Sequence, residues 1–425
     1  MALQMKDSGV EWIGEIPEGW KIYRNKVCFE CSKAVVGVAS SDTQLLSLTT
    51  KGIKQKRPED STGKVPDSYD TYQLVEPDDI VMCLFDLDVS AVFSGRSAYY
   101  GMISPAYKVL KCIERYTLPR FAEYWFAYVF DGRKFRHYSK NLRYTLTYEE
   151  FAVLPLAMPP LPEQHRIADF LDRRCAEIDA VIERTKATIE EYKKLKQAVI
   201  TEAVTKGVRG ERKMKDSGIE WIGEIPETWN VVRIKNLFDY RNERNYAPLE
   251  EVNLISLYTD KGVVQHCDLE ETTGNKASNA DGYKLVYEDD IVVNIILCWM
   301  GAIGRSAYNG VTSPAYDVYA PMPGTNSRFY HHLFRTQGFS GDCYKVGRGI
   351  MAMRWRTYSD QFRALKVVCP PAEEQEEIIA YLDEKCAALD TLIAKKTALL
   401  TELETYKKSL IYEYVTGKKE VPACP

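Results

Sequence analysis

Apolar and polar residues alternate in two distinct ways along the chain. In residues 1–158, and again in residues 211–369, short apolar runs of β type are separated by Gly, Pro, Asn and Asp residues. Such runs predict strands, among them 45–49, 80–84 and 107–110. A helical stretch at 120–130 follows the strands. The pattern indicates a mixed α+β globular domain in each region.

A different pattern follows each globular region, after Pro159-Pro160 and after Pro370-Pro371. Apolar residues recur there at steps of three, four and seven over about 45 residues, which predicts a long amphipathic helix with a coiled-coil stripe. At 1.5 Å per residue such a helix is about 60–65 Å long, more than a domain core requires. We expect the two helices to pack as an antiparallel coiled-coil spacer; the simpler alternative is that each packs only on its own domain. The stripe residues are Ile167, Leu171, Ile178, Ile182, Ile189, Tyr192 and Val199 in the first helix and Ile378, Leu382, Leu389, Ile393, Leu400, Leu403 and Leu410 in the second.

The chain is an internal duplication. Residues 5–20 and 214–229, the repeat-start segments, match at fourteen of sixteen positions. Further blocks recur at an offset of 209 or 211 residues, such as Gly-Arg-Ser-Ala-Tyr at 95–99 and 304–308. The predicted order is therefore a globular domain at 1–158, a spacer helix at 159–210, a second globular domain at 211–369 and a second spacer helix at 370–425.

Composition narrows the class of protein. The chain has 425 residues, of which 45% are hydrophobic and 27% charged, which is typical of a globular protein. The longest apolar run, 291–300, is far shorter than the ~20 residues that a bilayer span needs, and the N-terminus lacks the pattern of a signal peptide. Eleven cysteines at scattered spacings favour free thiols in a reducing cytoplasm.

The net charge bears on nucleic-acid binding. Fifty-six Lys and Arg residues against 60 Asp and Glu residues leave a net charge of −4. A chain that coats nucleic acid by itself is usually basic. Any DNA-binding surface here is therefore local, or is completed by partner proteins.

Three sets of motifs recur in the two copies. They are the two repeat-start segments that read KDSG-[VI]-EWIGEIP, the helix starts at 160–164 (PLPEQ) and 371–375 (PAEEQ), and the helix ends at 200–207 (ITEAVTKG) and 411–418 (IYEYVTGK). Together they resemble one family, the specificity (S) subunit of type I restriction-modification enzymes. No single motif is specific, but the combination covers the whole chain in the order found in that family: target-recognition domain, helix, target-recognition domain, helix.

The resemblance implies a DNA-binding subunit without an active site of its own. Each target-recognition domain would read one half of an asymmetric bipartite sequence. The helices would set the unread spacer and dock two modification (methyltransferase) subunits, and restriction subunits would join that core. It further implies that this chain binds no cofactor, and that S-adenosylmethionine, ATP and Mg²⁺ act on the partners, which also supply positive surface around double-stranded DNA.

Polar segments that differ between the two copies are the best candidates for reading different half-sites. Arginine reads guanine and Asn or Gln reads adenine, whereas Lys and Arg contacts to phosphate add affinity without sequence information. Residues 131–147 carry five Lys or Arg and one acid, and residues 343–358 carry four and no acid, both with interleaved aromatic residues. The simpler alternative is a solvated basic face. The candidates in these two segments are Arg133, Lys134, Arg136, Lys140, Asn141, Arg143, Tyr144, Lys345, Arg348, Arg354, Trp355 and Arg356.

Two further sets of residues are weaker candidates. The loops 54–64 and 265–276 also diverge between copies. Arg96 and Arg305, in the shared Gly-Arg-Ser, are either common phosphate contacts or structural salt bridges. The loop candidates are Lys54, Lys56, Arg57, Gln265 and Lys276.

The other motifs do not indicate a metal-binding or catalytic site. Cys28 and Cys31 have zinc-ligand spacing, but no second pair lies nearby and Leu237 and Tyr240 replace them in the second copy. The acid pairs at 78–79 and 289–290 precede apolar strands and are best interpreted as turn residues. No [DN]-P-P-[YF] methyltransferase motif and no phosphate-binding loop occurs. The histidines show no metal spacing shared between copies: His137, His165, His266, His331 and His332.

Two other functions stay open on these residues. The nearest alternative is the specificity subunit of a type IIB-like system, in which one partner chain both methylates and cleaves; only the partner's domain content separates the two. A scaffold of duplicated protein-binding domains is the alternative from another class, and it predicts no salt-dependent DNA affinity.

Overall fold

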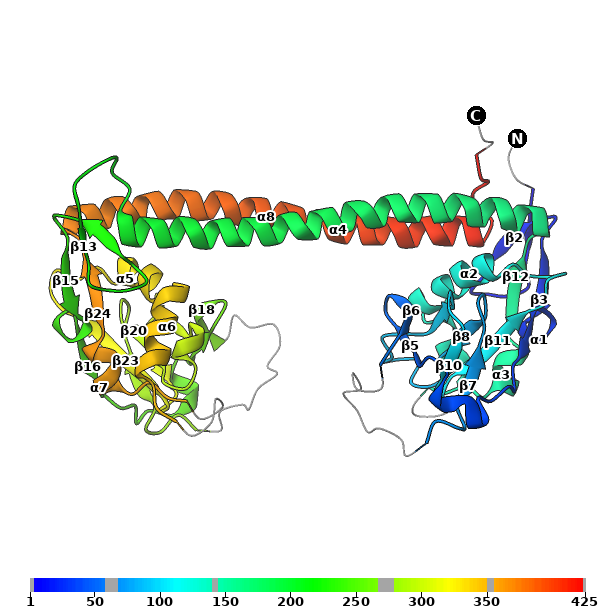
Figure 1. Cartoon of the computed structure of the whole chain (residues 1–425), viewed down its shortest axis with the longest axis horizontal. Coiled ribbons are helices and arrows are strands. Elements are labelled where there is room, and N and C mark those ends of the chain that lie inside the picture. Colours follow the sequence, from blue (N-terminus) through cyan, green and yellow to red (C-terminus); the bar gives the residue numbers. More distant parts are fainter. Residues whose placement is uncertain (1–3, 58–67, 140–143, 267–278, 350–354, 423–425) are drawn as a thin grey trace. The chain divides into compact units, whose positions relative to one another are not determined.

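The computed structural model describes residues 4–57, 68–139, 144–266, 279–349 and 355–422. The chain divides into two compact units: unit 1 comprises residues 1–186 and 398–425, and unit 2 comprises residues 187–397. Both ends of the chain therefore belong to unit 1 (Figure 1).

The globular part of unit 1 is built on a four-stranded antiparallel sheet in the order β4-β11-β8-β9. Four antiparallel pairs accompany it: β1-β2, β12-β3, β5-β6 and β10-β7. The strands are β1 (Met5–Asp7), β2 (Glu15–Pro17), β3 (Lys21–Arg24), β4 (Phe29–Cys31), β5 (Leu46–Thr49), β6 (Gly52–Gln55), β7 (Gln73–Val75), β8 (Ile80–Met82), β9 (Ser94–Arg96), β10 (Gly101–Ile103), β11 (Lys108–Cys112) and β12 (Pro155–Met158). The shorter helices are α1 (Asn25–Cys28), η1 (Gly37–Ser41), α2 (Pro119–Asp131), η3 (Lys134–Tyr138) and α3 (Tyr148–Ala152).

Unit 2 repeats this topology, with the sheet order β16-β23-β20-β21 and the pairs β13-β14, β15-β24, β17-β18 and β19-β22. The strands are β13 (Met214–Asp216), β14 (Glu224–Pro226), β15 (Asn230–Arg233), β16 (Phe238–Arg241), β17 (Ile255–Tyr258), β18 (Gly262–Gln265), β19 (Lys284–Val286), β20 (Ile291–Asn294), β21 (Ile303–Arg305), β22 (Gly310–Thr312), β23 (Tyr316–Pro321) and β24 (Lys366–Cys369). The shorter helices are η4 (Ile234–Asn236), η5 (Leu249–Glu251), η7 (Cys298–Met300), α5 (Ser327–Phe334), α6 (Gln337–Val346) and α7 (Ser359–Ala364).

The predicted α+β tandem duplication is confirmed, and the central strands explain the apolar runs. Every residue of β8 and of β20 is buried, because helices cover one face of the sheet and smaller strand pairs cover the other. The predicted helix at 120–130 is α2, whose apolar face buries Phe121, Trp125 and Phe126. In unit 2 two shorter helices, α5 and α6, take its place.

Two long helices, α4 (Leu161–Lys206) and α8 (Ala372–Val415), each contribute to both units. In unit 1 the ring of Phe170 lies 4.5 Å from that of Tyr414, and Lys407 pairs with Asp179 at 2.7 Å. Because the number of the α8 partner falls as the number of the α4 residue rises, the helices are antiparallel.

The parts of α4 and α8 that belong to unit 2 also run antiparallel (Figure 1). Lys196 pairs with Asp390, and Arg209, just beyond α4, pairs with Glu377, both at 2.6 Å. The expected antiparallel packing of the two helices is thus present in each unit.

The helical stripes also belong to the domain cores. In unit 1 Ile167, Leu171, Ile178 and Ile182 of α4 share one apolar core with Leu410 of α8 and with the residues of the globular domain. In unit 2 the helices contribute Ile378 and Leu382 to the corresponding core, and Ile189 is buried as well. The helices therefore pack both on each other and on the domains. The remaining stripe residues are half-buried: Tyr192, Val199, Leu389, Ile393, Leu400 and Leu403.

The end of each long helix docks on a repeat-start segment. In unit 2 α4 ends at Gly207, which lies against Trp229, and Lys206 donates to the carbonyl oxygens of Ile222 and Glu224. In unit 1 it is α8 that ends on the first segment: Gly417 lies against Trp20 and Pro17, and Lys418 donates to the carbonyl of Glu15. Both glycines have positive φ, and a Cβ at either would collide with its neighbours.

The shared helix-start motif has a structural explanation. The buried Gln164 side chain accepts a hydrogen bond from the Leu118 N–H at 2.8 Å and donates to the carbonyls of Tyr116 and Pro159 at 2.8 and 2.9 Å. Gln375, its counterpart, is also buried and donates to Pro370 at 2.8 Å. The glutamine thus ties the start of each long helix to the preceding loop.

Replacing Gln164 by Ala should lower the free energy of unfolding by about 2–3 kcal/mol, because three buried or partly buried backbone groups would lose their partner. Chemical denaturation of the chain measures this loss. His165→Ala, at the next and exposed position of the same helical turn, is the matched control and should change stability by less than ~0.5 kcal/mol. Equal effects of the two substitutions would contradict this role of Gln164.

Candidate nucleic-acid interface

The basic segment of unit 1 folds against the loop between β8 and β9, here called the β8–β9 loop (residues 83–93). The Leu146 N–H donates to the carbonyl of Leu84 at 2.8 Å, and the Leu87 N–H donates to the carbonyl of Tyr144 at 3.1 Å. Although these partners lie about sixty residues apart in sequence, they form one surface at the end of the central strand β8.

Two arginines of this segment hold the loop. Arg133, at φ 47°, donates to the carbonyls of Leu87 and Ser90 at 2.9 and 3.1 Å. Arg136 pairs with Asp88 at 3.1 Å and stacks on the ring of Tyr144 at 4.5 Å. Neighbouring Lys134 lies over the Tyr128 ring at 5.8 Å. Arg133 therefore positions the loop, whereas Arg136 stays about half-exposed beside an acid.

Unit 2 builds the corresponding surface in the same register. The Thr357 N–H donates to the carbonyl of Ile295 at 2.9 Å, and both residues lie 211 positions after Leu146 and Leu84. The loop that receives it, here the β20–β21 loop (residues 295–302), is clamped by another arginine. Arg335 donates to the carbonyl of Ile303 at 2.9 Å, directly after the loop.

The second basic segment presents two adjacent cations. Arg348 and Arg356 exchange backbone N–H···O bonds of 2.8 and 2.9 Å, so they lie directly opposite each other. Opposite residues of an antiparallel pair put their side chains on the same face, where like charges repel. No ion pair joins either arginine to a carboxylate within the described part of the chain. By contrast, Lys345 pairs with Glu220 at 2.7 Å.

Aromatic rings lie beside these arginines. Tyr344 stacks on Trp355 with ring centroids 5.1 Å apart and contacts Trp299 of the β20–β21 loop at 5.5 Å. The Trp355 indole N–H donates to the carbonyl of Tyr344 at 3.0 Å. Rings fixed next to arginines that pair with no carboxylate of the described residues form a surface that suits a polyanion with flat, stackable groups.

The weaker loop candidates lie elsewhere in each unit. Lys54, Lys56 and Arg57 lie on or just after β6, with Lys54 and Arg57 exposed, and Gln265 ends the equivalent strand β18. Five candidates lie outside the described residues: Lys140, Asn141, Arg143, Lys276 and Arg354.

Arg96 and Arg305 are each engaged by two carboxylates. Arg96 pairs with Asp78 at 2.7 Å and Glu123 at 2.9 Å. Arg305 pairs with Asp289 at 2.5 Å and Glu288 at 3.7 Å. The salt-bridge interpretation of the shared Gly-Arg-Ser is confirmed, while a phosphate contact of either arginine stays a prediction.

The remaining sequence motifs have structural roles. Asp78 and Asp289 have φ near +70° in matching turns, and Asp79 and Asp290 accept backbone hydrogen bonds, which confirms the acids as turn residues. Burial raises the pKa of the Cys28 thiol to about 12, so this side chain stays protonated, unlike a zinc-bound thiolate. Among the described residues no cluster of metal-binding side chains occurs, and no helix is long and apolar enough to cross a membrane.

Two half-buried histidines of α5 are neutral. Burial lowers the pKa of His331 to about 3 and that of His332 to about 4. The Nδ1 atom of His331 accepts the Arg305 backbone N–H at 3.1 Å. His331 therefore supports strand β21, and neither imidazole carries a positive charge that could attract a phosphate.

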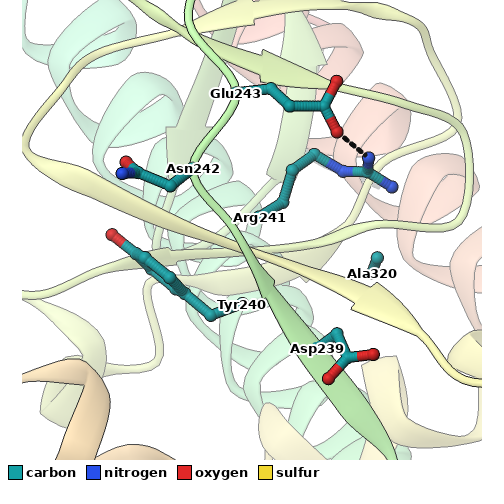
Figure 2. A pocket seen from close by; sticks show the side chains of 6 residues that line it. All are labelled: Asp239, Tyr240, Arg241, Asn242, Glu243 and Ala320. Carbon is teal, nitrogen blue, oxygen red and sulfur yellow. Dashed lines mark hydrogen bonds and ion pairs between the residues drawn. The ribbon is translucent and has the colours of Figure 1, made fainter.

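A shallow cavity of about 410 Å³ lies along the edge strand β16 (Figure 2). Its lining includes Asp239, Arg241 and Glu243. Arg241 is already held by Glu243 at 2.6 Å and by Asp290 at 2.9 Å, as Figure 2 shows for Glu243. Because acids outnumber the one engaged cation, the cavity does not suit a phosphate.

Comparisons with known proteins agree with this architecture. The family model described as "Type I restriction modification DNA specificity domain" matches residues 226–404. The type I restriction enzyme MjaVIII specificity subunit of Methanocaldococcus jannaschii is 33% identical over 283 residues, or 64% of this chain and 63% of the relative. The putative MjaX specificity subunit of the same organism is 27% identical over 282 residues, or 63% of this chain and 60% of the relative. The chain is thus similar to type I specificity subunits over nearly two thirds of its length.

The alignments span less than two thirds of the length of either of these specificity subunits. Solved structures show the same fold over nearly the whole chain. A chain from a type I restriction-modification system studied for its complex assembly and conformational transition has a TM-score of 0.69 at 12% identity and covers 95% of this chain and 99% of its own. The HsdS subunit from Thermoanaerobacter tengcongensis has a TM-score of 0.50 at 14% identity, with 95% and 98% covered.

Sequence reasoning found the two basic segments of this chain but missed the loops on which they fold. The β8–β9 loop reads DLDV at 86–89 and the β20–β21 loop reads LCWM at 297–300. A signal was present: the offset between copies changes from 211 at β8 to 209 at β9, so two residues were gained or lost here. A length change between otherwise matching strands marks a variable loop.

The neutral histidines make the stability of unit 2 depend on pH. Since their pKa values are lowered in the folded state, protonation favours unfolding, and stability is lost as pH falls below about 6.5. We expect a loss of at most about 1.4 kcal/mol per histidine and pH unit, because the unfolded state then binds one more proton per histidine. Denaturation between pH 4.5 and 7.5 measures it. A double variant, His331→Gln with His332→Gln, should flatten the profile; an unchanged slope would contradict this assignment.

Proposed function

We propose that this chain is the DNA sequence-recognition subunit of a type I restriction-modification complex. Each globular domain is a target-recognition domain that reads one half of an asymmetric bipartite site. The long helices set the unread spacer and dock two modification subunits. The chain has no catalytic role; methylation and cleavage are performed by modification and restriction subunits that use S-adenosylmethionine, ATP and Mg²⁺.

One observation carries the proposal: the chain builds the same surface twice, in the same register, with different side chains. The bonds Leu146 to Leu84 and Thr357 to Ile295 attach a basic segment to the end of the same strand in each unit. Around them unit 1 places an Arg136–Asp88 pair, whereas unit 2 places two arginines and three aromatic rings. A common frame with different surface groups suits the reading of two different sequences.

The charge distribution supports DNA over a protein partner. Arg348 lies opposite Arg356, and no carboxylate of the described residues pairs with either, which is unfavourable in the isolated chain; phosphates would remove the repulsion. Because such cations are local, a net charge of −4 is compatible with DNA binding when partner subunits cover the rest of the duplex.

A methylation map tests the function. The chain is co-expressed with its modification subunit in a methylation-free host, and modified adenines are located by sequencing. We expect two short specific blocks separated by a fixed unread gap. Replacing residues 131–147 should change one block, and replacing residues 343–358 should change the other.

Either exchange serves as the control for the other, because the unit left unchanged should keep its block. A contiguous motif, or no motif despite a stable and active complex, would contradict the two-reader function and favour a scaffold. Cleavage and methylation activities in a single partner chain would instead favour the type IIB-like system.

The paired arginines make a separate prediction. In the complex with modification subunits, the double variant Arg348→Ala, Arg356→Ala should reduce the slope of log affinity against log salt by up to about 1.8, because each lost phosphate contact accounts for about 0.9. Fluorescence anisotropy with duplex DNA at several salt concentrations measures the slope. Lys345→Ala removes a lysine already paired with Glu220 and should leave the slope nearly unchanged. Equal slopes for all three proteins would contradict phosphate contact by the arginines.

A further inference from the structure

The loops that sequence reasoning missed share a defined turn. In the β8–β9 loop the Val89 N–H donates to the carbonyl of Asp86 at 3.1 Å. In the β20–β21 loop the Met300 N–H donates to the carbonyl of Leu297 at 2.9 Å. Donor and acceptor are both shifted by 211 residues, so Val89 and Met300 occupy the same position of the same turn.

Each turn contains one buried residue and, two positions later, one exposed apolar residue. Leu87 is 4% exposed and Cys298 is fully buried, so each loop is anchored in its core. Two residues later, Val89 is 79% exposed and Met300 is 54% exposed. Large apolar side chains so exposed, at matching positions of two divergent loops, lack a structural role in the folded chain.

An arginine donates hydrogen bonds to backbone carbonyls within or directly beside each loop. Arg133 binds the carbonyls of Leu87 and Ser90 in unit 1, and Arg335 binds that of Ile303 in unit 2. Arg133 and Arg335 do not occupy equivalent positions of the two copies, so each unit supports its loop with a different arginine. A fixed loop loses little conformational entropy when it binds a partner.

An ion pair lies beside the apex of unit 1, and aromatic rings lie beside the apex of unit 2. Arg136 pairs with Asp88, the residue next to Val89. Trp299, next to Met300, contacts the ring of Tyr344, which in turn stacks on Trp355, the residue before Arg356. An apolar point within such a surface matches duplex DNA, in which the bases offer apolar groups between two rows of phosphates.

We propose that Val89 and Met300 are specificity-determining residues that each make an apolar contact with a base of the half-site read by their own unit. This inference rests on the proposed function. It assigns to each target-recognition domain a second reading element, the loop apex, in addition to the basic segment.

The methylation map described above tests the apices one at a time. Val89→Ala should reduce the preference for the best base at one position by about 10-fold, in the block that replacement of residues 131–147 also changes. Met300→Ala should do the same in the other block. Each variant is the control for the other, and Val153→Ala removes a 49%-exposed valine outside the loop of unit 1 and should leave both blocks unchanged.

Near-isosteric variants guard against misfolding. Val89→Thr and Met300→Gln keep the shape of each apex but replace an apolar group by a polar one, and they should give the same loss of preference. Retained preference at every position in all four apex variants, with a bipartite wild-type motif, would overturn the inference and leave the proposed function intact. A wild-type map without a bipartite motif would contradict the proposed function, and this inference with it.

The contact can also be assigned to a chemical group. When the preferred base at the affected position is thymine, probes with deoxyuridine there lack only the 5-methyl group. Loss of wild-type affinity on this replacement, with no further loss in the apex variant, would support contact with the methyl group. Unchanged wild-type affinity on this replacement at a preferred thymine, together with no fluorescence change of 2-aminopurine placed at the adjacent step, would overturn an apolar base contact.

Discussion

The fold depends on one constraint: a long amphipathic helix has to bury its apolar stripe. Most of the stability of such a helix comes from tertiary packing and not from intrinsic propensity. Here the stripe of α4 enters the core of unit 1 through Ile167 and Leu171, and α8 enters the same core through Leu410 and Val415. Neither helix can slide by a turn without disrupting a domain core, so the domains determine the helix register.

The repeat-start segment of each unit also depends on a long helix. A repeat-start segment needs the end of a long helix against its tryptophan, and each unit takes that helix end from a different part of the sequence. Gly207 meets Trp229 in unit 2 after a short connection, whereas Gly417 meets Trp20 from the far end of the chain in unit 1. Residues 398–425 are therefore part of the first unit in structure although they are last in sequence.

The candidate interface separates shared support from variable surface. Both copies retain the Gly-Arg-Ser salt bridges and the turn acids, which face inward or engage each other. The groups that differ, such as Asp88 against Trp299, are gathered around two loops at the ends of matching strands. Such a division allows the surface to change without loss of the fold, since the backbone bonds that attach the basic segments do not depend on side-chain identity.

The sequence alone determined the duplication, the α+β class, the two long helices and the basic character of two segments, because repeats, periodicity and local charge are properties of neighbouring residues. Tertiary structure decided which half of each helix completes which unit, and it engaged Arg96 and Arg133 in quite different contacts. It also placed Val89 and Met300 at exposed apices, although both follow apolar runs that suggest buried strands. These outcomes depend on contacts between residues far apart in the chain, which no local pattern records.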